Sequence, residues 1–280
     1  MKCCKIISTH FNHRKERNRG HWAGVTWPSH IQFGLDPQGV LIMLKDQISI
    51  ETDVDAGVKC DTIIVNGRAG FKEGDDYVRS INGQKTLCGK IFSIEMDNIG
   101  GQFGAYNLAY KIHEGKYDYW MFDEDDIVVT GHHYYKKLIN RLGVDEYCYA
   151  LIGLGRADRH TRRLGKVCPP GAMLLVNKKI LEHLKRVDGM LPHPIKSGHK
   201  SRVQKGELAF SLRIYDLGYK IVYYGKSKQG KTVEWEYETE YCLPYRELIE
   251  KFGTVDYFKQ STFYRGVGWD ILWKNANESL

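Results

Sequence analysis

The chain has 280 residues, 42% of them hydrophobic, and a formal net charge of +7, which is enough to bury the core of one large domain. No apolar run approaches the roughly 20 residues that a membrane span requires. The seven cysteines are odd in number and contain no Cys-x-x-Cys pair, which argues against a disulfide framework and a structural zinc site. We therefore expect a cytoplasmic protein with no transmembrane segment.

Short apolar strands alternate with amphipathic helices through the first half of the chain. Such alternation is typical of a mostly parallel sheet with helices on both faces. In these sheets, ligands bind beyond the carboxyl ends of the strands. The pair Asn66-Gly67 is a turn signal, which predicts the end of the second strand. We expect strands at 5–9, 61–65, 91–94 and 118–122, and helices at 40–48 and 104–114.

The second half continues with a strand at 172–176, helices at 178–187 and 207–217, and a strand at 219–224. The second of these helices is expected to end at Gly218, a natural helix stop. Its spacing places Leu208, Leu212 and Tyr215 on one stripe, which we expect to be buried. Residues 236–280 are aromatic and acidic, and three roles stay open for them: packing on the domain, contact with a ligand, or dimerisation.

Four carboxylates follow one another at 123–126, in the turn Asp123-Glu124-Asp125-Asp126 between two apolar runs. Carboxylates this close repel each other unless a cation neutralises them. Oxygen ligands of this kind suit Mg²⁺ or Mn²⁺, which typically take one or two protein carboxylates and complete their coordination with substrate phosphate oxygens. An acidic loop that faces solvent is the alternative interpretation. The position at the end of a buried strand favours the metal site.

Basic residues gather in three clusters, at 14–19, 156–166 and 196–205. Such clusters suit phosphates, nucleic acid or an anionic membrane surface. The aromatic residues needed for stacking on single strands are not interleaved with them, so we expect no stable nucleic-acid partner. A basic rim around a site for an anionic ligand is the preferred interpretation, and peripheral membrane contact is a further one.

Five segments, in this order, resemble glycosyltransferases of the GT-A fold, and most closely the inverting family 2 group. Together they span about residues 3–225. They are Ile-Ile-Val-Asn-Gly at 63–67, Asn-Ile-Gly-Gly-Gln-Phe-Gly-Ala-Tyr-Asn at 98–107, Phe-Asp-Glu-Asp at 122–125, Pro-Pro-Gly-Ala-Met at 169–173, and Gly-Glu-x₅-Arg-x₄-Gly-Tyr at 206–219.

The resemblance implies metal-dependent transfer of a sugar, with inversion, from a nucleotide-diphosphate sugar to a hydroxyl group. A UDP-sugar is the first candidate for the donor. The acceptor would be a glycan, a lipid-linked molecule or a protein-linked molecule, and it can be anionic. The resemblance implies Glu207 as the general base. Asp188 is the next candidate for the proton acceptor if Glu207 does not serve. Asp123 would contact the ribose, and Asp125, with Asp123 and Asp126 beside it, would hold Mn²⁺ or Mg²⁺. The other donor-binding residues that it implies are Thr9, Asn66, Asn107, Gly171 and Ala172.

The chain departs from the family pattern at three places. Asn66 stands where an acid is usual, and Glu207 stands where Asp is more common. No histidine follows His199, so the C-terminal histidine ligand of some metal-dependent relatives is missing. The resemblance divides the chain into a glycosyltransferase domain at 1–235, with a nucleotide-sugar-binding half at about 1–130 and an acceptor half at about 131–235, and an extension at 236–280.

Two other enzyme classes share features with this sequence. The segment Gly-Lys-Ser-Lys-Gln-Gly-Lys-Thr at 225–232 matches the phosphate-loop pattern. That pattern requires a helix next, whereas residues 233–238 alternate as a strand does. A sugar nucleotidyltransferase shares the general architecture but would carry a glycine-rich basic loop after the first strand. Residues 8–14 are basic but lack the glycines, so this class remains the alternative.

Overall fold

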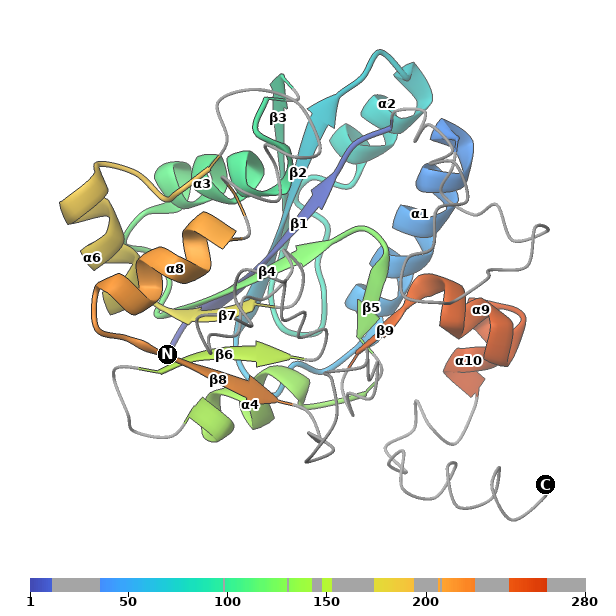
Figure 1. Cartoon of the computed structure of the whole chain (residues 1–280). Coiled ribbons are helices and arrows are strands. Elements are labelled where there is room, and N and C mark those ends of the chain that lie inside the picture. Colours follow the sequence, from blue (N-terminus) through green and yellow to red (C-terminus); the bar gives the residue numbers. More distant parts are fainter. Residues whose placement is uncertain are drawn as a thin grey trace, which may run out of the picture.

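The computed structural model describes residues 1–11, 36–97, 99–129, 131–142, 148–152, 174–193, 206, 208–224 and 242–260. In this part of the chain a seven-stranded sheet is flanked by helices (Figure 1). No helix in these ranges is both long and apolar enough to span a lipid bilayer. The basic clusters at 14–19, 156–166 and 196–205 and the phosphate-loop pattern at 225–232 lie outside them.

The sheet has the strand order β3-β2-β1-β4-β7-β6-β8. Four of its strand pairs are parallel, and β7 runs antiparallel to both of its neighbours. The expected fold class, a mostly parallel sheet between helices, is therefore confirmed. The strands are β1 (Cys3–Thr9), β2 (Cys60–Arg68), β3 (Ile91–Asp97), β4 (Tyr119–Glu124), β6 (Cys148–Ile152), β7 (Leu174–Asn177) and β8 (Lys220–Tyr224).

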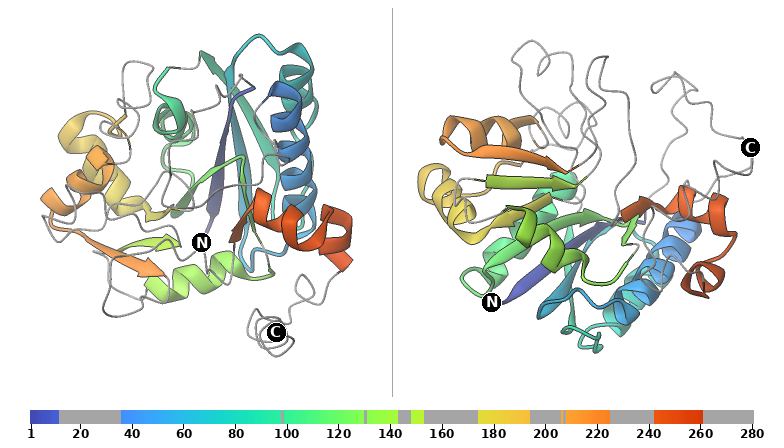
Figure 2. Two further views of the ribbon diagram at one scale, coloured as in Figure 1. Left: turned by 45° about the vertical axis from the view of Figure 1, so that its right-hand side comes forward. Right: turned by 90° about the horizontal axis from the view of Figure 1, so that it is seen from below.

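Helices cover both faces because the central strands are apolar on both sides. In β1, Ile6 and Ile7 point in opposite directions and belong to different hydrophobic clusters. The cluster around Ile7 includes α1 (Pro37–Asp53), α2 (Lys72–Ser80) and α4 (Tyr134–Leu142). The cluster around Ile6 includes α3 (Gly101–His113), α6 (Lys178–Asp188) and α8 (Ala209–Asp216). Figure 2 shows α1 and α6 on opposite sides of the sheet.

The prediction that Asn66-Gly67 forms a turn is wrong. Strand β2 continues through both residues, which pair in register with Glu95 and Met96 of β3. Asn-Gly favours tight turns, but the longer partner strand supplies ladder hydrogen bonds as far as Arg68. The buried Nδ2 group of Asn66 also has a partner, because it donates to Asp75 Oδ1 at 2.7 Å.

The expected buried stripe of α8 is also wrong. Leu208, Leu212 and Tyr215 are only partly buried, and the buried side chains are Phe210, Ser211 and Ile214. The helix is rotated relative to the expected stripe because Phe210 packs on two aromatic rings. Its ring centroid lies 5.4 Å from that of Phe103 in α3 and 5.8 Å from that of Phe122 in β4. The helix stop is confirmed: Gly218 has φ 85°, a left-handed conformation that glycine adopts without strain.

Residues 242–260 pack on the domain beside the acidic turn. Strand β9 (Cys242–Pro244) pairs antiparallel with β5 (Ile127–Val129), which directly follows the turn. Helices α9 (Tyr245–Phe252) and α10 (Val255–Gln260) continue to α1, where Tyr245 Oη donates to Asp46 Oδ2 at 2.5 Å. Lys259 Nζ pairs with Asp53 Oδ2 at 2.6 Å. Of the three roles left open for 236–280, packing on the domain is the one observed for these residues.

Candidate active site

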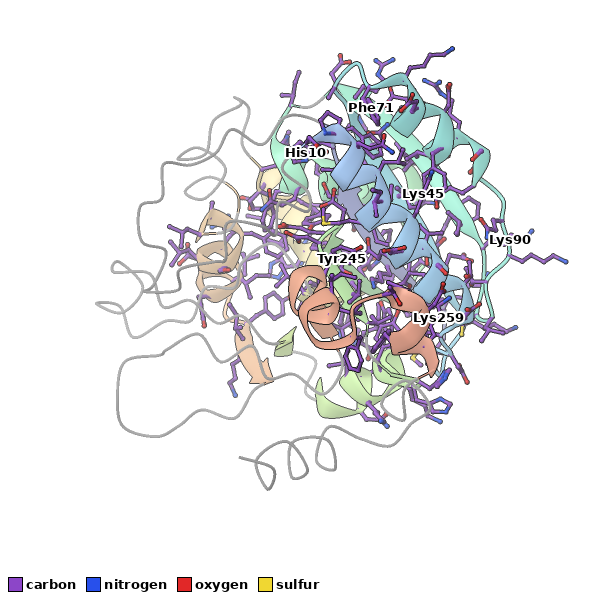
Figure 3. The ribbon with its side chains drawn as sticks, turned by 90° about the vertical axis from the view of Figure 1, so that its right-hand side faces the viewer. His10, Lys45, Phe71, Lys90, Tyr245 and Lys259 are labelled. Atoms are coloured by element: carbon purple, nitrogen blue, oxygen red, sulfur yellow. The ribbon has the colours of Figure 1, made fainter. Side chains whose placement is uncertain are left out.

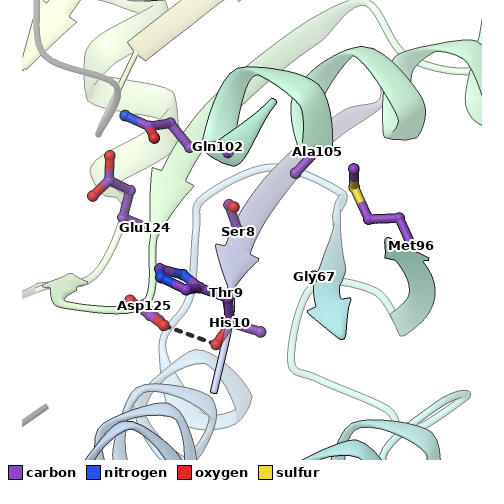
Figure 4. Close-up of a pocket in the computed structure, with 10 residues that line it drawn as sticks. Ser8, Thr9, His10, Gly67, Met96, Gln102, Ala105, Glu124 and Asp125 are labelled. Carbon is purple, nitrogen blue, oxygen red and sulfur yellow. Dashed lines mark hydrogen bonds between the residues drawn. The ribbon is translucent and has the colours of Figure 1, made fainter. Parts of the chain in front are cut away.

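A pocket opens where the carboxyl ends of β1, β2 and β4 meet the first turn of α3 (Figure 4). This is the edge at which parallel sheets bind ligands. Thr9 of β1, Gly67 of β2 and Gln102 of α3 line it, together with Glu124 and Asp125 from the acidic turn. The structure therefore brings four segments that are far apart in the sequence to one place.

The Asp125 carboxylate is fixed at the wall of this pocket. Thr9 Oγ1 donates a hydrogen bond to Asp125 Oδ2 at 2.8 Å (Figure 4), and the two residues are 1% and 2% exposed. A hydroxyl that donates to a carboxylate fixes the orientation of that carboxylate. Two of the predicted site residues, Thr9 and Asp125, thus lie together as one unit.

The acidic turn is held from below by α1. Gln47 Nε2 donates to the carbonyl oxygen of Glu124 at 3.1 Å and to that of Ile127 at 2.6 Å. A backbone amide donates from the far side, since Tyr245 N–H bonds to the Asp126 carbonyl oxygen at 2.8 Å. These bonds clamp both ends of the turn, so the pocket wall is built on a rigid scaffold. Asp126 itself does not line the pocket.

Asp123 lies behind the pocket wall, in an ionic cluster that is closed to solvent. Its Oδ2 is 2.9 Å from Nζ of Lys5, and the same ammonium group pairs with Glu51. The side chains of Lys5 and Asp123 are 0% exposed and that of Glu51 is 3% exposed. Strand alternation explains the placement: Asp123 points to the α1 side of β4, whereas Glu124 points to the α3 side.

Burial and charge act in opposite directions on this cluster. Burial raises the pKa of Asp123 to about 7, while the neighbouring Lys5 opposes that rise. Burial alone would lower the pKa of Lys5, but Asp123 and Glu51 raise it above its ordinary value. The ammonium group therefore stays protonated, and one cation faces two carboxyl groups away from water.

The amino end of α3 faces the pocket without a side-chain cap. The cap residue Gly100 and the first helical residue Gly101 have φ values of 87° and 57°, which glycine tolerates. A side chain at Gly104 would approach the Ile99 carbonyl oxygen to 2.4 Å, so the glycines allow the loop to fold closely onto the helix. Uncapped amides and the helix dipole make such an end attractive to anions.

Asn66 and Asn107 lie just outside the pocket. Asn66 is fully buried under Gly67, and its Oδ1 has no partner among the residues that the structure describes. Asn107 Oδ1 accepts a hydrogen bond from Leu191 N at 3.0 Å, which ties α3 to the segment after α6. Neither side chain lines the pocket, and their donor contacts remain predictions.

Three of the predicted residues, Glu207, Gly171 and Ala172, lie outside the described ranges. Gly206, which precedes Glu207, is buried, and a side chain there would come within 2.9 Å of the Phe103 ring of α3. Asp188 is bound to Arg213, with Nε to Oδ2 at 2.8 Å and Nη2 to Oδ1 at 2.7 Å. Both of its oxygens are engaged, so Asp188 is a poor substitute proton acceptor.

Sequence reasoning missed Lys5, Glu51 and Gln47, and it named Glu124 only as a member of the acidic turn. A signal existed for Lys5, because a lysine within the apolar run Cys-Cys-Lys-Ile-Ile at 3–7 needs a buried anion as its partner. Glu51 and Gln47 carry a weaker signal, since a polar residue on a helix usually faces solvent. Only the packing of α1 against β1 and β4 shows that these two side chains face inward.

Comparison with known proteins gives a likeness of fold. No protein-family model matches the sequence, and no curated protein matches it. Among solved structures, it is similar to TarS of S. aureus, residues 1–349, with 15% identity and a TM-score of 0.45, over 87% of this chain and 60% of that one. It is also similar to the mannosyltransferase PcManGT of Pyrobaculum calidifontis in complex with GDP-Man and Mn²⁺. The identity is 11% and the TM-score is 0.48, over 82% of this chain and 58% of that one.

A glucose-1-phosphate thymidylyltransferase from Bacillus anthracis is similar too, with 13% identity and a TM-score of 0.41, over 81% of this chain and 87% of that one. GT-A-like glycosyltransferases are therefore among the structures that this fold resembles, as the sequence implied. Membership of the family 2 group is not shown. Every one of these TM-scores lies below 0.5, so the likeness carries no conclusion about function.

Proposed function

We propose that the protein transfers a sugar from a nucleotide-diphosphate sugar to a hydroxyl acceptor, and that the donor binds in the pocket at the ends of β1, β2 and β4. The observation that carries this proposal is the Thr9–Asp125 unit: a carboxylate fixed in orientation at the pocket wall, with Glu124 beside it. A fixed carboxylate opposite an uncapped helix end suits a ligand that carries both a diphosphate and its counter-cation.

The residues at the pocket fit a hard divalent cation. Asp125 and Glu124 offer carboxylate oxygens, and no cluster of three metal-binding side chains occurs within the described ranges. Mg²⁺ and Mn²⁺ suit such a site because they take one or two protein carboxylates and leave the remaining positions to substrate phosphates and water. When bound, the cation would act as a Lewis acid that neutralises charge on the departing diphosphate. Asp125 would hold it, with Glu124 beside it in place of the predicted Asp123 and Asp126.

The chain's own groups would place the donor in three ways. The uncapped first turn of α3 would face the diphosphate, because its amides and dipole favour anions. The Oδ1 of Asn66, which has no partner among the described residues, would accept a hydrogen bond from the base through a bridging water. We assign Asp123 to positioning rather than to the ribose contact that the resemblance implies, since its carboxyl group is buried against Lys5.

The attacking hydroxyl needs a carboxylate that takes its proton as the new bond forms. We propose Glu207 for this role. Gly206, its neighbour in the chain, packs on Phe103, and Phe103 follows the pocket residue Gln102. Glu207 as base leaves Arg213 and Asp188 to hold α8 against α6, as their paired hydrogen bonds do.

The test is a reaction with a panel of nucleotide sugars, UDP-sugars first, in the presence of Mn²⁺, with detection of the released nucleoside diphosphate. Glu207→Gln should keep donor affinity and reduce turnover by about 10²- to 10⁴-fold. Glu182→Gln is a matched control, because Glu182 is an exposed acid on α6 away from the pocket. Release of pyrophosphate from a nucleoside triphosphate and a sugar phosphate, with no turnover of nucleotide sugars, would contradict the proposal and favour a nucleotidyltransferase.

A further inference from the structure

A second, wider hollow lies at the opposite edge of the sheet, where β1 and β2 begin. It has a volume of about 820 Å³. Five exposed lysines line it, and we name this surface the lysine face: Lys2, Lys59, Lys85, Lys90 and Lys116. None of the five belongs to the basic clusters noted in the sequence. Lys90 projects well clear of the ribbon in Figure 3.

The lysines of this face have few anionic partners among the residues that the structure describes. Within the described part of the chain, none of the five ammonium groups forms an ion pair with a carboxylate, and only that of Lys116 has a hydrogen-bond partner, His113 Nδ1 at 3.3 Å. The nearby acids include Asp55, Asp61 and Asp118. Asp61 accepts hydrogen bonds from Tyr117 Oη and from the Lys90 backbone, Asp118 accepts one from the Lys2 backbone, and Asp55 accepts one from Cys88 Sγ at 3.4 Å. The five lysines outnumber these three carboxylates, which leaves a positive excess.

An exposed leucine lies between two of these lysines in the sequence. Leu87 is 67% exposed and lies in a tight turn whose two ends, Lys85 and Lys90, form an antiparallel β-bridge. The turn is held by Gly89 N–H to Thr86 Oγ1 at 2.9 Å and by Leu87 N–H to the Thr52 carbonyl oxygen at 3.2 Å. These hydrogen bonds therefore fix the turn in a conformation that exposes the Leu87 side chain to solvent.

An exposed apolar side chain flanked by lysines, as Leu87 is by Lys85 and Lys90, is a combination that peripheral proteins use on bilayers. The cations attract anionic headgroups, and the apolar tip enters the boundary between headgroups and acyl chains.

We propose that the lysine face docks on a membrane surface that contains anionic lipids, with Leu87 inserted between the headgroups. Binding of a soluble polyanion would explain the five lysines but not the exposed leucine between Lys85 and Lys90. The inference does not depend on the proposed activity. Strands β1 and β2 begin at the lysine face with Cys3 and Cys60 and end near the candidate active site with Thr9 and Asn66, so a docked molecule keeps its pocket directed away from the bilayer.

The charge component is tested by sedimentation of the full chain with phosphatidylcholine vesicles, with and without phosphatidylserine. We expect binding only with phosphatidylserine, and loss of that binding in high salt. The double variant Lys85→Glu/Lys90→Glu should bind at least about thirtyfold more weakly. The control Lys72→Glu/Lys136→Glu makes the same change of net charge on α2 and α4 and should bind as the parent does. Equal loss in both variants would mean that only net charge matters and would overturn the proposal.

The apolar component is tested by Leu87→Ser, which leaves the charge unchanged and removes the side chain proposed to insert. We expect about tenfold weaker vesicle binding, from the apolar area no longer buried. Ile42→Ser is the matched control, because Ile42 is 40% exposed on α1 and does not line the hollow. The proposal is overturned if the two serine variants bind alike, or if the protein binds inositol hexakisphosphate through these lysines but does not bind vesicles.

Discussion

The Nζ atom of Lys5 lies 2.9 Å from Oδ2 of Asp123, and neither side chain is exposed to solvent. Lys5 also pairs with Glu51 of α1, so a single cation joins β1, β4 and α1 directly beneath the acidic turn. Buried ion pairs add little net stability, but removal of one partner leaves an uncompensated charge in the interior. The cluster therefore fixes the positions of β1, β4 and α1 relative to one another. Removal of one of its charges should lower the free energy of unfolding.

We predict that Lys5→Met lowers the free energy of unfolding by about 3–5 kcal/mol, because two carboxyl groups then remain buried without a cation. Urea unfolding followed by circular dichroism measures this change. The triple variant Lys5→Met/Glu51→Gln/Asp123→Asn removes all three charges and should recover most of the loss. A loss below about 1 kcal/mol for Lys5→Met, in the range of a surface pair, would show that the cluster does not form.

Thr9→Val should weaken the binding of a nucleotide sugar with Mn²⁺ by about tenfold, because the hydrogen bond to the charged Asp125 is lost. Valine has the same shape and suits a strand, so the fold should be unaffected. Thr9→Ser keeps the hydroxyl group and should bind nearly as the parent does. Calorimetric titration of the three proteins makes the comparison, and equal weakening by valine and serine would contradict the role of the hydroxyl group.

Asn107→Ala should reduce the free energy of unfolding by about 1 kcal/mol and leave donor affinity unchanged, because the Leu191 N–H loses its acceptor. The family resemblance implies the opposite result, a loss of donor affinity. Urea unfolding and a donor titration on the same variant distinguish the two. A rise of tenfold or more in the donor Kd with unchanged stability would restore the donor contact.

His113 should make the protein less stable in mild acid. Burial, with a smaller contribution from Lys116, lowers the pKa of His113 below its ordinary value of 6.5. The unfolded chain then binds a proton more readily than the folded chain does, so the free energy of unfolding falls as the pH drops through about 6.5 and below. His113→Phe keeps ring packing against Phe92 and Tyr117 and cannot titrate, so its unfolding free energy should depend less on pH between 7 and about 5.

Local sequence patterns were sufficient to predict the sheet and the side of it on which the site lies. The apolar runs at 5–9 and 118–122 predicted strands of a mostly parallel sheet, and the acidic turn predicted a site beyond the end of one of them. What the patterns could not predict were orientations set by tertiary packing. Two examples are the continuation of β2 through Asn66-Gly67, which depends on the length of β3, and the rotation of α8, which depends on the Phe103 and Phe122 rings.

The same limit applies to the acidic turn. Its residue types indicate oxygen ligands, but alternation along β4 decides which of them face the pocket. That alternation directs Asp123 towards Lys5 and Glu124 towards the pocket, whereas Asp125 lies in the turn after β4 and is bound at the pocket wall by Thr9. Lys5 and Glu51 are separated by 46 residues, so their pairing could be seen only when β1 and α1 were placed side by side.

The central claim is that Asp125 holds a divalent cation together with a nucleotide-sugar donor. Its most direct test is calorimetric titration of a UDP-sugar into the protein with Mn²⁺ and with excess chelator, for the parent and for Asp125→Asn. The variant keeps the shape of the side chain and can still accept the hydrogen bond from Thr9, so the fold should persist. We predict saturable donor binding by the parent only with Mn²⁺, and loss of the Mn²⁺ effect in Asp125→Asn. Equal donor affinity in all four titrations would contradict the claim.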